Sequence, residues 1–562
     1  SMGSGQVVHI DDMEIKEVIP NYGGDDQRYT SPYQRRSYGI NLQTTSTACD
    51  LGTGFYYVAG SRLGNQTHVK ASGRYVSGCG DANEYYSTGG NTLNFGTTDM
   101  MLIGHAGAYN TIGLNIGSGT VWNCRSFSTH FANSSHYTSY WNTSAPTDGV
   151  ASKIHTINGN LNILHGGLNT QYQSGSRYSF GLVVSGEVKI YDDAFLDCNV
   201  QDTHADNAHQ SFGSLTINSG GTYKATSQTT TITDRTSAGY QLFSAVGDII
   251  HNDGTFTFEG SSGGGSDVRL NGASDGTNGF HNVIINASGR TVSINSYALT
   301  IANDFTITAG TFNTSGSNYA LTVKGNTKVT GTLTGNNSVF SFGTDGSHGS
   351  IEQGTLWVEA AGSFTFGSGD VTVFGGITAK GTEAIPCMTS TGGGDIIIKG
   401  RTNNGFMNSH SHHGVNITGD YIIDYDTAAI FDNRGGTTIQ CGTFIIKHDG
   451  RTYEPWSNSG QDLFKIIGDM SITQGTFDTE YSGQDSQKLE VTGTCTIGDG
   501  SGSAAAITGN SSPSISFGSL VIDSDGTYDA TPHTTTITGG FRPADVAGTL
   551  NLNNGAWAFS GV

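Results

Sequence analysis

Three histidines lie close together in NSHSHHGVN, Asn408–Asn416. In an extended strand His410 and His412 point to the same face, and neutral imidazoles placed in this way bind transition metals. His410, His412 and His413 are therefore the candidate ligands of a structural iron or zinc ion. A solvated loop whose histidines bind nothing would have the same sequence, so both interpretations stay open.

Carboxylate pairs are a second source of chemistry, because glycoside hydrolysis needs one carboxyl group as acid and another as base or nucleophile. The candidates are Asp192 in YDDAFLDCN, and Asp424 with Asp426 in IIDYD. A chain with 47 acidic residues also produces such pairs as solvated turn residues. The sequence contains no nucleophile elbow, phosphate-binding loop, zinc-protease motif or dinucleotide fingerprint. We therefore favour a protein that is not an enzyme; if it is one, we expect a glycoside hydrolase or polysaccharide lyase.

Aromatic residues surrounded by Asn, Ser and Thr are the candidates for carbohydrate binding. Sugar rings stack a C–H face on an aromatic ring while amides and hydroxyls fix their orientation. The residues with this setting are Tyr137, Tyr140, Trp141, Tyr453 and Trp456. The alternative is that these rings fill the protein core.

No motif requires a cofactor. The turns GGGSD, Gly263–Asp267, and DNRGG, Asp432–Gly436, have residues that suit calcium but lack the full repeat of calcium-binding nonapeptides. A structural iron, zinc or calcium ion is thus the only cofactor that the sequence suggests.

The elements that must position these residues come from internal repeats. SFGSLTINSGGTYKATSQTTTIT, Ser211–Thr233, recurs almost unchanged as SFGSLVIDSDGTYDATPHTTTIT, Ser516–Thr538. A second set of related segments, INGNLNILHGGLNT, IANDFTITAGTFNT and IIGDMSITQGTFDT, begins at Ile157, Ile301 and Ile466. The chain therefore contains three long copies of one unit.

Within each copy, apolar and polar residues alternate as in β-strands. In FTITAGTFNT, Phe305, Ile307 and Ala309 are expected to point one way and Thr306 and Thr308 the other. Gly, Asn and Asp separate these short strands and suit tight corners. A string of sandwich domains is the competing architecture, but only 8 prolines are present and no linkers are evident. We predict an all-β fold, a right-handed parallel β-helix or β-solenoid.

The predicted organisation has four parts. Residues 1–150 lack the repeat pattern and form a distinct β-rich N-terminal domain, either an attachment or a lectin-like domain. Solenoid repeats follow at 151–300, 301–465 and 466–562. The third copy stops before its expected continuation, so we expect the chain to be a fragment of a longer protein.

Charge and cysteine content restrict the partners. The net charge of −21 disfavours nucleic acid and anionic membranes, and no apolar run approaches the length of a membrane span. The 7 cysteines form no CxxC pair. They are expected to be buried thiols, with a Cys49–Cys79 bridge as the alternative.

FTITAGTFNTSGSNYALTVKGNTKVTGTLTG, Phe305–Gly335, resembles the β-helical shafts of phage tail fibres and tailspikes and of large secreted bacterial adhesins. The spacing of His410 and His412 resembles the HxH elements of phage tail-fibre tips. The resemblance implies a homotrimer on a virion surface or outside the cell. Its function would be that of a receptor-binding fibre that contacts host-surface polysaccharide. The alternatives are a secreted bacterial adhesin, matrix or filament protein, and a tailspike-type polysaccharide depolymerase.

Overall fold

The structure is a computed structural model of the chain. Between residues 49 and 141 it describes ten short strands. Side chains are described at residue 99, at residues 121–130 and in most of the later ranges. The backbone ranges described after residue 141 are 154–170, 181–199, 209–233, 243–260, 268–271, 279–294, 297–344, 356–399, 405–407, 414–424, 429–432, 436–456, 462–480, 487–509, 514–542 and 545–560.

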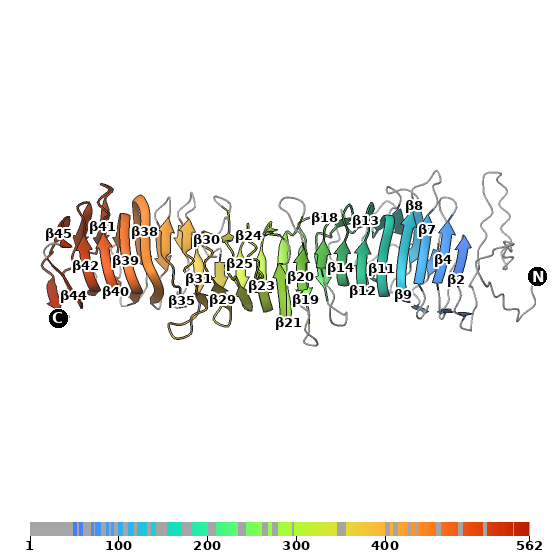
Figure 1. The fold of residues 1–562 in the computed structure, drawn as a ribbon, viewed down its shortest axis with the longest axis horizontal. Coiled ribbons are helices and arrows are strands. Elements are labelled where there is room, and N and C mark those ends of the chain that lie inside the picture. The colour runs from blue at the N-terminus through green and yellow to red at the C-terminus, as the bar shows by residue number, and fades with distance from the viewer. Residues whose placement is uncertain are drawn as a thin grey trace, which may run out of the picture. The chain divides into compact units, whose positions relative to one another are not determined.

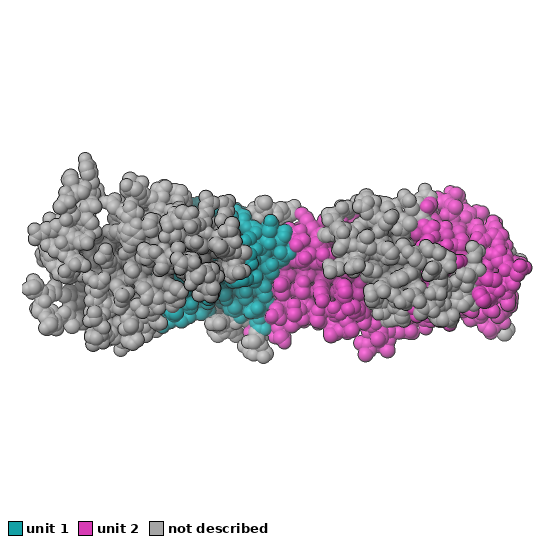
Figure 2. Space-filling model, turned by 180° about the vertical axis from the view of Figure 1, so that it is seen from behind, with its two compact units in different colours: residues 1–282 teal, residues 283–562 magenta. Residues whose placement is uncertain are grey.

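These residues form 46 β-strands and no α-helix, in two compact units, Ser1–Asn282 and Val283–Val562 (Figure 2). The strands of the first unit are β1 (Cys49–Gly52), β2 (Phe55–Ala59), β3 (Val69–Ala71), β4 (Arg74–Cys79), β5 (Tyr86–Thr88), β6 (Thr92–Asn94), β7 (Asp99–Gly104), β8 (Thr111–Ile116), β9 (Val121–Phe131), β10 (Tyr137–Trp141), β11 (Ile154–Asn169), β12 (Gly181–Ile190), β13 (Ala194–Asp197), β14 (Gln210–Ile217), β15 (Thr222–Lys224), β16 (Thr229–Ile232), β17 (Phe243–Ala245), β18 (Asp248–Ile250), β19 (Thr255–Glu259) and β20 (Val268–Asn271).

The strands of the second unit begin with β21, whose first residue still belongs to the first unit. They are β21 (Asn282–Ile294), β22 (Leu299–Ile301), β23 (Phe305–Asn313), β24 (Leu321–Val323), β25 (Thr327–Val329), β26 (Thr332–Thr334), β27 (Phe340–Phe342), β28 (Leu356–Val358), β29 (Ser363–Phe366), β30 (Val371–Phe374), β31 (Ile377–Ala379), β32 (Met388–Ser390), β33 (Ile396–Lys399), β34 (Gly405–Met407), β35 (Val415–Asn416), β36 (Tyr421–Asp424), β37 (Ala429–Asp432), β38 (Thr437–Trp456), β39 (Leu463–Asp478), β40 (Lys488–Ile497), β41 (Ala505–Thr508), β42 (Ser514–Ile522), β43 (Gly526–Asp529), β44 (Thr534–Ile537), β45 (Thr549–Asn551) and β46 (Ala556–Phe559).

Each unit is a parallel β-solenoid in which one coil of the chain pairs with the next. Figure 1 shows this for β11, β12 and β14, which lie side by side with Ile163, Ile190 and Ile217 at matching positions. In the second unit, one inward column consists of residues that are at most 1% exposed, in which each aliphatic, phenylalanine or methionine side chain contributes about 1.5–3 kcal/mol by burial. They are Phe340, Val371, Ile396, Tyr421, Phe444, Met470, Cys495 and Leu520. The predicted all-β solenoid is confirmed.

The predicted alternation in FTITAGTFNT holds for its first residues and then changes at a corner. Phe305 and Ile307 are fully buried, whereas Ala309 is only half-buried. The strand turns at Gly310, whose φ is 84° and where a Cβ would lie 2.0 Å from the carbonyl oxygen of Ala287. The prediction for Ala309 failed because a solenoid strand bends without ending, which strict alternation does not anticipate.

The two nearly identical segments of the sequence have the same local structure. The buried hydroxyl of Tyr223 lies 2.8 Å from Thr230 Oγ1, and that of Tyr528 lies 2.9 Å from Thr535 Oγ1. In both segments the last threonine donates its hydroxyl to a phenylalanine carbonyl one coil earlier, at 3.2 and 3.3 Å. The shared sequence therefore preserves a tyrosine–threonine pair inside the coil, where an unpaired hydroxyl would be costly.

Carboxylates at one corner of the second unit satisfy the backbone of the following coil. Asp370 accepts from the backbone N–H of Asp395 at 3.1 Å, Asp395 from that of Asp420 at 2.8 Å, and Asp420 from that of Thr443 at 2.9 Å. These bonds replace main-chain partners where the β-ladder is interrupted. Burial, together with the charges of Asp420 and Asp370, raises the pKa of Asp395.

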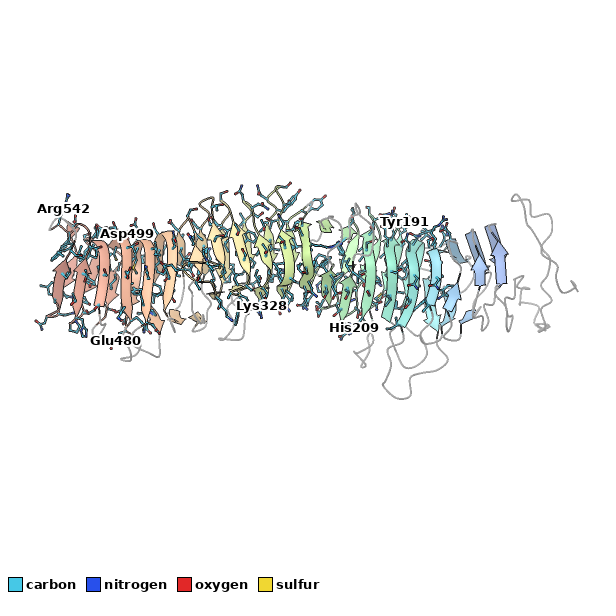
Figure 3. The ribbon with its side chains drawn as sticks, turned by 90° about the horizontal axis from the view of Figure 1, so that it is seen from below. Tyr191, His209, Lys328, Glu480, Asp499 and Arg542 are labelled. Carbon is cyan, nitrogen blue, oxygen red and sulfur yellow. The ribbon has the colours of Figure 1, made fainter. Side chains whose placement is uncertain are left out.

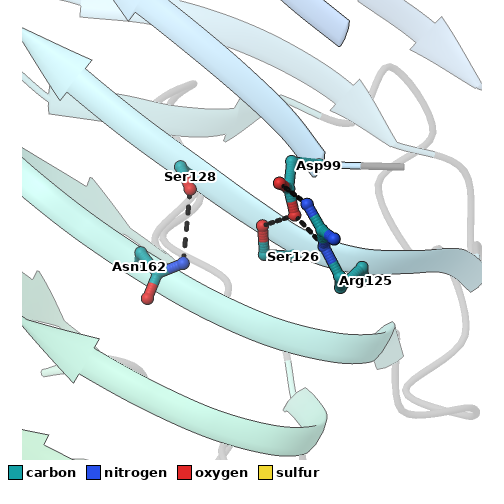
Figure 4. Close-up of polar contacts among 5 residues, drawn as sticks. All are labelled: Asp99, Arg125, Ser126, Ser128 and Asn162. Atoms are coloured by element: carbon teal, nitrogen blue, oxygen red, sulfur yellow. Dashed lines mark hydrogen bonds and ion pairs between the residues drawn. The ribbon is translucent and has the colours of Figure 1, made fainter. Parts of the chain in front are cut away.

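Polar side chains also join neighbouring strands of the first unit. Asp99 on β7 accepts hydrogen bonds at 2.7 Å from both Arg125 Nε and Ser126 Oγ on β9 (Figure 4). Asn162 on β11 donates to Ser128 Oγ at 3.3 Å. Exposed pairs of this kind add only about 0–1 kcal/mol each, so the apolar interior contributes most of the stability.

Parallel pairing also includes strands within residues 1–150. β9 pairs with β11 from Val121 opposite Thr156 to His130 opposite His165. The boundaries at residues 150, 300 and 465 remain predictions. Among the residues that the structure describes, no helix is long and apolar enough to cross a bilayer.

Candidate functional site

The outer face of the second unit carries a group of charged and aromatic side chains, Lys328, Trp357, Glu359 and Lys380, which we name the Trp357 cluster. Strands β25, β28 and β31 position it, because they pair in parallel with Lys328 beside Trp357 and Trp357 beside Thr378. Lys328 and Trp357 each lie between two buried residues of their strand and therefore point outward. Figure 3 shows Lys328 projecting from the ribbon.

Electrostatic contacts hold the Trp357 cluster together. Glu359 lies 3.3 Å from Lys328 Nζ and 3.1 Å from Lys380 Nζ. Lys380 Nζ is also 4.4 Å from the centre of the Trp357 ring, a distance at which an ammonium group is attracted by the indole. Partial burial acts to raise the pKa of Glu359, but the hydrogen bonds and charges of Lys380 and Lys328 outweigh burial, so this pKa lies below its ordinary value.

The Trp357 cluster combines the groups that bind a sugar. The indole is half-buried, and its Nε1 is buried without a hydrogen-bond partner among the described residues. The N–H edge therefore faces the protein, and the ammonium groups of Lys380 and Lys328 lie 4.4 and 5.7 Å from the centre of the ring. An aromatic surface, two ammonium donors and one carboxylate acceptor can together contact the C–H face and the hydroxyls of a sugar.

Two carboxylates form a second candidate site in the same unit. β38 and β39 pair through Tyr453 and Phe477, so the following residues, Glu454 and Asp478, are neighbours on the outer face. Burial and the charge of Asp478 raise the pKa of Glu454. Burial also raises the pKa of Asp478, more than the hydrogen bond from the Glu480 backbone N–H, 2.9 Å long, lowers it. Adjacent carboxyl groups with raised pKa values are suited to acid–base catalysis on a glycosidic bond.

Three potential metal ligands, His251, Asp253 and His281, lie together in the first unit. Their potential ligand atoms all lie within 4.8 Å of one another. Imidazole nitrogen and carboxylate oxygen are donors that suit zinc and related ions. None of these three residues was a candidate in the sequence.

Most of the site residues predicted from the sequence have no described side chain. Their roles remain predictions. His410, His412, His413 and Asp426 lie outside the described residues, and Tyr137, Tyr140, Trp141 and Trp456 have a described backbone, in β10 and β38, but no described side chain.

The remaining candidates have definite positions. Asp192 is exposed in the tight turn between β12 and β13 of the first unit. Asp424 is the last residue of β36 in the second unit, half-buried and in register with Lys399. The Tyr453 ring is fully buried and stacks on Phe477 with 5.4 Å between ring centres. Tyr453 is therefore a core residue, the alternative that the sequence had left open for these aromatics.

The Trp357 cluster and the Glu454–Asp478 pair could not be found from the sequence without the coil register. Trp357 is 29 residues from Lys328 and 21 from Thr378, by subtraction, so no fixed period connects the three. The local signal was a tryptophan at an outward position of its strand, paired with Lys328 on β25.

No protein-family model, curated protein or solved structure matches this chain.

Proposed function

We propose that this protein is a structural, receptor-binding extracellular fibre protein, of the kind found on virion surfaces and in viral tail fibres, that contacts host-surface polysaccharide. The Trp357 cluster is the observation that carries the proposal. It places an aromatic ring among ammonium and carboxylate groups on the outer face of a solenoid. A ring of this size on a polar surface is well suited to stacking against a sugar.

The arrangement of the coils supports a polymer rather than a small ligand. Parallel strands repeat their outward positions about every 4.8 Å, so hydroxyls stand in columns across successive coils. Thr365 and Thr389 are one such pair, with 3.1 Å between their Oγ1 atoms. A polysaccharide, which presents hydroxyls repeatedly along its length, can contact many coils at once and gain affinity from each contact.

The proposal also covers the architecture and the assembly. The coils wind right-handed, an attachment or lectin-like domain occupies residues 1–150, and three long repeats occupy residues 151–562. Three copies of the chain form a homotrimer. A secreted bacterial adhesin or matrix protein would need the same surface, and it is the closest alternative. The acidic charge of −21 supports partners other than nucleic acid or anionic membrane.

The second candidate function is polysaccharide depolymerisation, and Glu454 with Asp478 is the observation that favours it. In that reaction the carboxyl group with the higher pKa would protonate the glycosidic oxygen. The other carboxylate would activate water or attack the sugar.

The decisive experiment incubates the protein with a panel of bacterial and algal surface polysaccharides and follows polymer size and protein elution by chromatography. We expect the protein to elute with an intact polymer. Trp357→Ala should weaken this retention at least about tenfold, since stacking on an aromatic surface is lost. Lys447→Ala, which removes an exposed lysine of β38, should leave it unchanged. Equal retention of all three proteins would refute the role of the Trp357 cluster.

Shortening of the polymer would instead establish the enzyme. In that case Glu454→Gln and Asp478→Asn should each abolish shortening while retention persists. If shortening survived both changes but was lost in Asp192→Asn, Asp424→Asn or Asp426→Asn, the carboxylates predicted from the sequence would be the catalytic ones. If no polymer were retained or shortened, a purely mechanical role as a filament subunit would replace both proposals.

A further inference from the structure

Three side chains with metal-binding atoms meet at one corner of the first unit. His251 and Asp253 belong to the turn between β18 and β19. His281 immediately precedes β21, on the following coil, where the backbone N–H of Asn282 donates to the Gly254 carbonyl at 3.2 Å. Asp253 Oδ1 lies 3.5 Å from His251 Nδ1 and 3.4 Å from His281 Nδ1.

The two histidine side chains are largely buried, whereas the aspartate side chain is exposed. The side chain of His251 is 10% exposed and that of His281 is 23% exposed, whereas that of Asp253 is 79% exposed. The two imidazoles are held by the coil, with 5.1 Å between ring centres. Asp253 is the exposed member, so its carboxylate lies on the solvent side of the group.

A matching turn in the second unit shows that the turn backbone does not require His251 and Asp253. The HNDG turn that begins at His251 corresponds to the LNNG turn that begins at Leu552. The two central residues have φ of 47° and 58° in the first turn and of 43° and 59° in the second. In each turn the first central asparagine donates its side-chain amide to a carbonyl of the preceding coil, at 2.6 and 3.0 Å.

The same backbone therefore forms with Leu552 and Asn554 at the positions of His251 and Asp253. Asp253 is not needed for the positive φ, since asparagine adopts it equally well. The turn backbone alone therefore does not explain why both positions carry metal-binding side chains, although as whole residues His251 is 8% exposed and Leu552 is 55% exposed.

We propose that His251, Asp253 and His281 bind a divalent transition-metal ion of the zinc type. In a tetrahedral site with metal–ligand distances of about 2.1 Å, neighbouring ligand atoms are about 3.4 Å apart. Both measured nitrogen–oxygen distances agree with this value. Two nitrogens and one oxygen suit zinc, nickel, cobalt or copper rather than calcium, which takes six to eight oxygens. The three ligands leave a fourth position for water or a ligand group.

One existing contact has to change when the ion binds. The backbone N–H of Asp253 donates to His251 Nδ1 at 3.0 Å. An ion bound at Nδ1 displaces this hydrogen bond, and an ion bound at Nε2 requires the ring to turn. In either case the ion links two successive coils, because His281 lies one coil beyond the turn.

The experiment uses the full chain after treatment with a chelator. Cobalt, whose visible absorption reports tetrahedral coordination, is added in increments, and zinc binding is measured by calorimetry. The site variant combines His251→Leu with Asp253→Asn, the residues that the matching turn carries, so its fold is expected to persist. A second variant is His281→Ala. A third variant, His410→Ala with His412→Ala and His413→Ala, removes the histidines predicted as ligands from the sequence. The control variant is His533→Ala, which removes an exposed histidine of the second unit.

We expect one equivalent of cobalt to give tetrahedral absorption, and zinc to displace it. The site variant and His281→Ala should each weaken binding at least about tenfold, as loss of a ligand requires, whereas the control variant should bind like the unaltered chain. Binding that is lost in the third variant but kept in the site variant would assign the ion to His410, His412 and His413 and overturn the proposal. Failure of the unaltered chain to bind either metal would overturn it as well.

Discussion

At the scale of single residues, His155 shows what the solenoid interior does to a titratable group. It lies in β11, is 2% exposed, and its ring centre is 5.9 Å from that of Trp122. Burial lowers the pKa of His155 to about 3, because the interior solvates an imidazolium ion poorly. The residue is therefore neutral in the folded protein throughout the neutral range.

We predict that this residue makes the protein less stable as the pH falls below about 6.5. Between the ordinary pKa of 6.5 and the folded value of about 3, the unfolded chain binds a proton that the folded chain does not. The loss at about pH 5 is on the order of 2 kcal/mol. Thermal unfolding at about pH 7 and pH 5 should show a smaller acid-induced fall for His155→Phe than for the unaltered chain. An equal fall in both would mean that His155 does not contribute.

At the scale of the elements, glycines occupy positions where the backbone of one coil passes very close to that of the previous coil. Gly213 and Gly518 occupy the same position in the two nearly identical segments, Ser211–Thr233 and Ser516–Thr538. A Cβ would lie 2.5 Å from the Ser185 carbonyl oxygen at the first and 2.3 Å from the Thr492 carbonyl oxygen at the second. Both segments keep this glycine because only glycine lets the backbone of one coil approach the previous one so closely.

Gly518→Ala should therefore lower the free energy of unfolding by about 1–3 kcal/mol through overpacking against a rigid backbone atom. Gly540→Ala is the matched control, since a Cβ there meets nothing within 4 Å. It should leave stability unchanged or raise it slightly, because alanine restricts the unfolded chain. Urea-induced unfolding compares the two variants, and equal midpoints would contradict this account of the glycine.

Local patterns predicted these elements but gave no indication of the groups that side chains of successive coils form together. Alternation identified Phe305 and Ile307 as inward residues, since the side-chain period of a strand is a local property. The Trp357 cluster and the group of His251, Asp253 and His281 depend on which residues of successive coils stand in register. Register varies with the length of each corner loop, and no local pattern in the sequence reports it.

At the scale of the whole molecule, the cysteines report how consistently the solenoid buries its inward residues. The chain has 7 cysteines, of which five have described side chains, and all five are free and buried. Burial raises the pKa of each of these thiols, to about 12 for Cys124 and Cys441. This agrees with the expectation of buried thiols for these five residues, in both units.

We predict that a thiol-reactive aromatic disulfide at about pH 8 modifies at most two cysteines of the native protein. The protected residues would be Cys124, Cys198, Cys387, Cys441 and Cys495, because the reactive thiolate forms poorly in a buried position. After denaturation all 7 should react, or five if Cys49 and Cys79 are bridged. Rapid modification of three or more thiols in the native state would show that the interior opens readily.

Because each coil pairs only with its two neighbours, the gene can change in length without disturbing the fold. Val371, Ile396 and Tyr421 follow one another at intervals of 25 residues, by subtraction, and each pairs only with the positions directly before and after it in this column. Recombination that adds or removes a gene segment encoding one such interval would change the number of coils while creating no new kind of contact. Descendants of this gene can therefore differ in length by whole coils and still fold by the same rules.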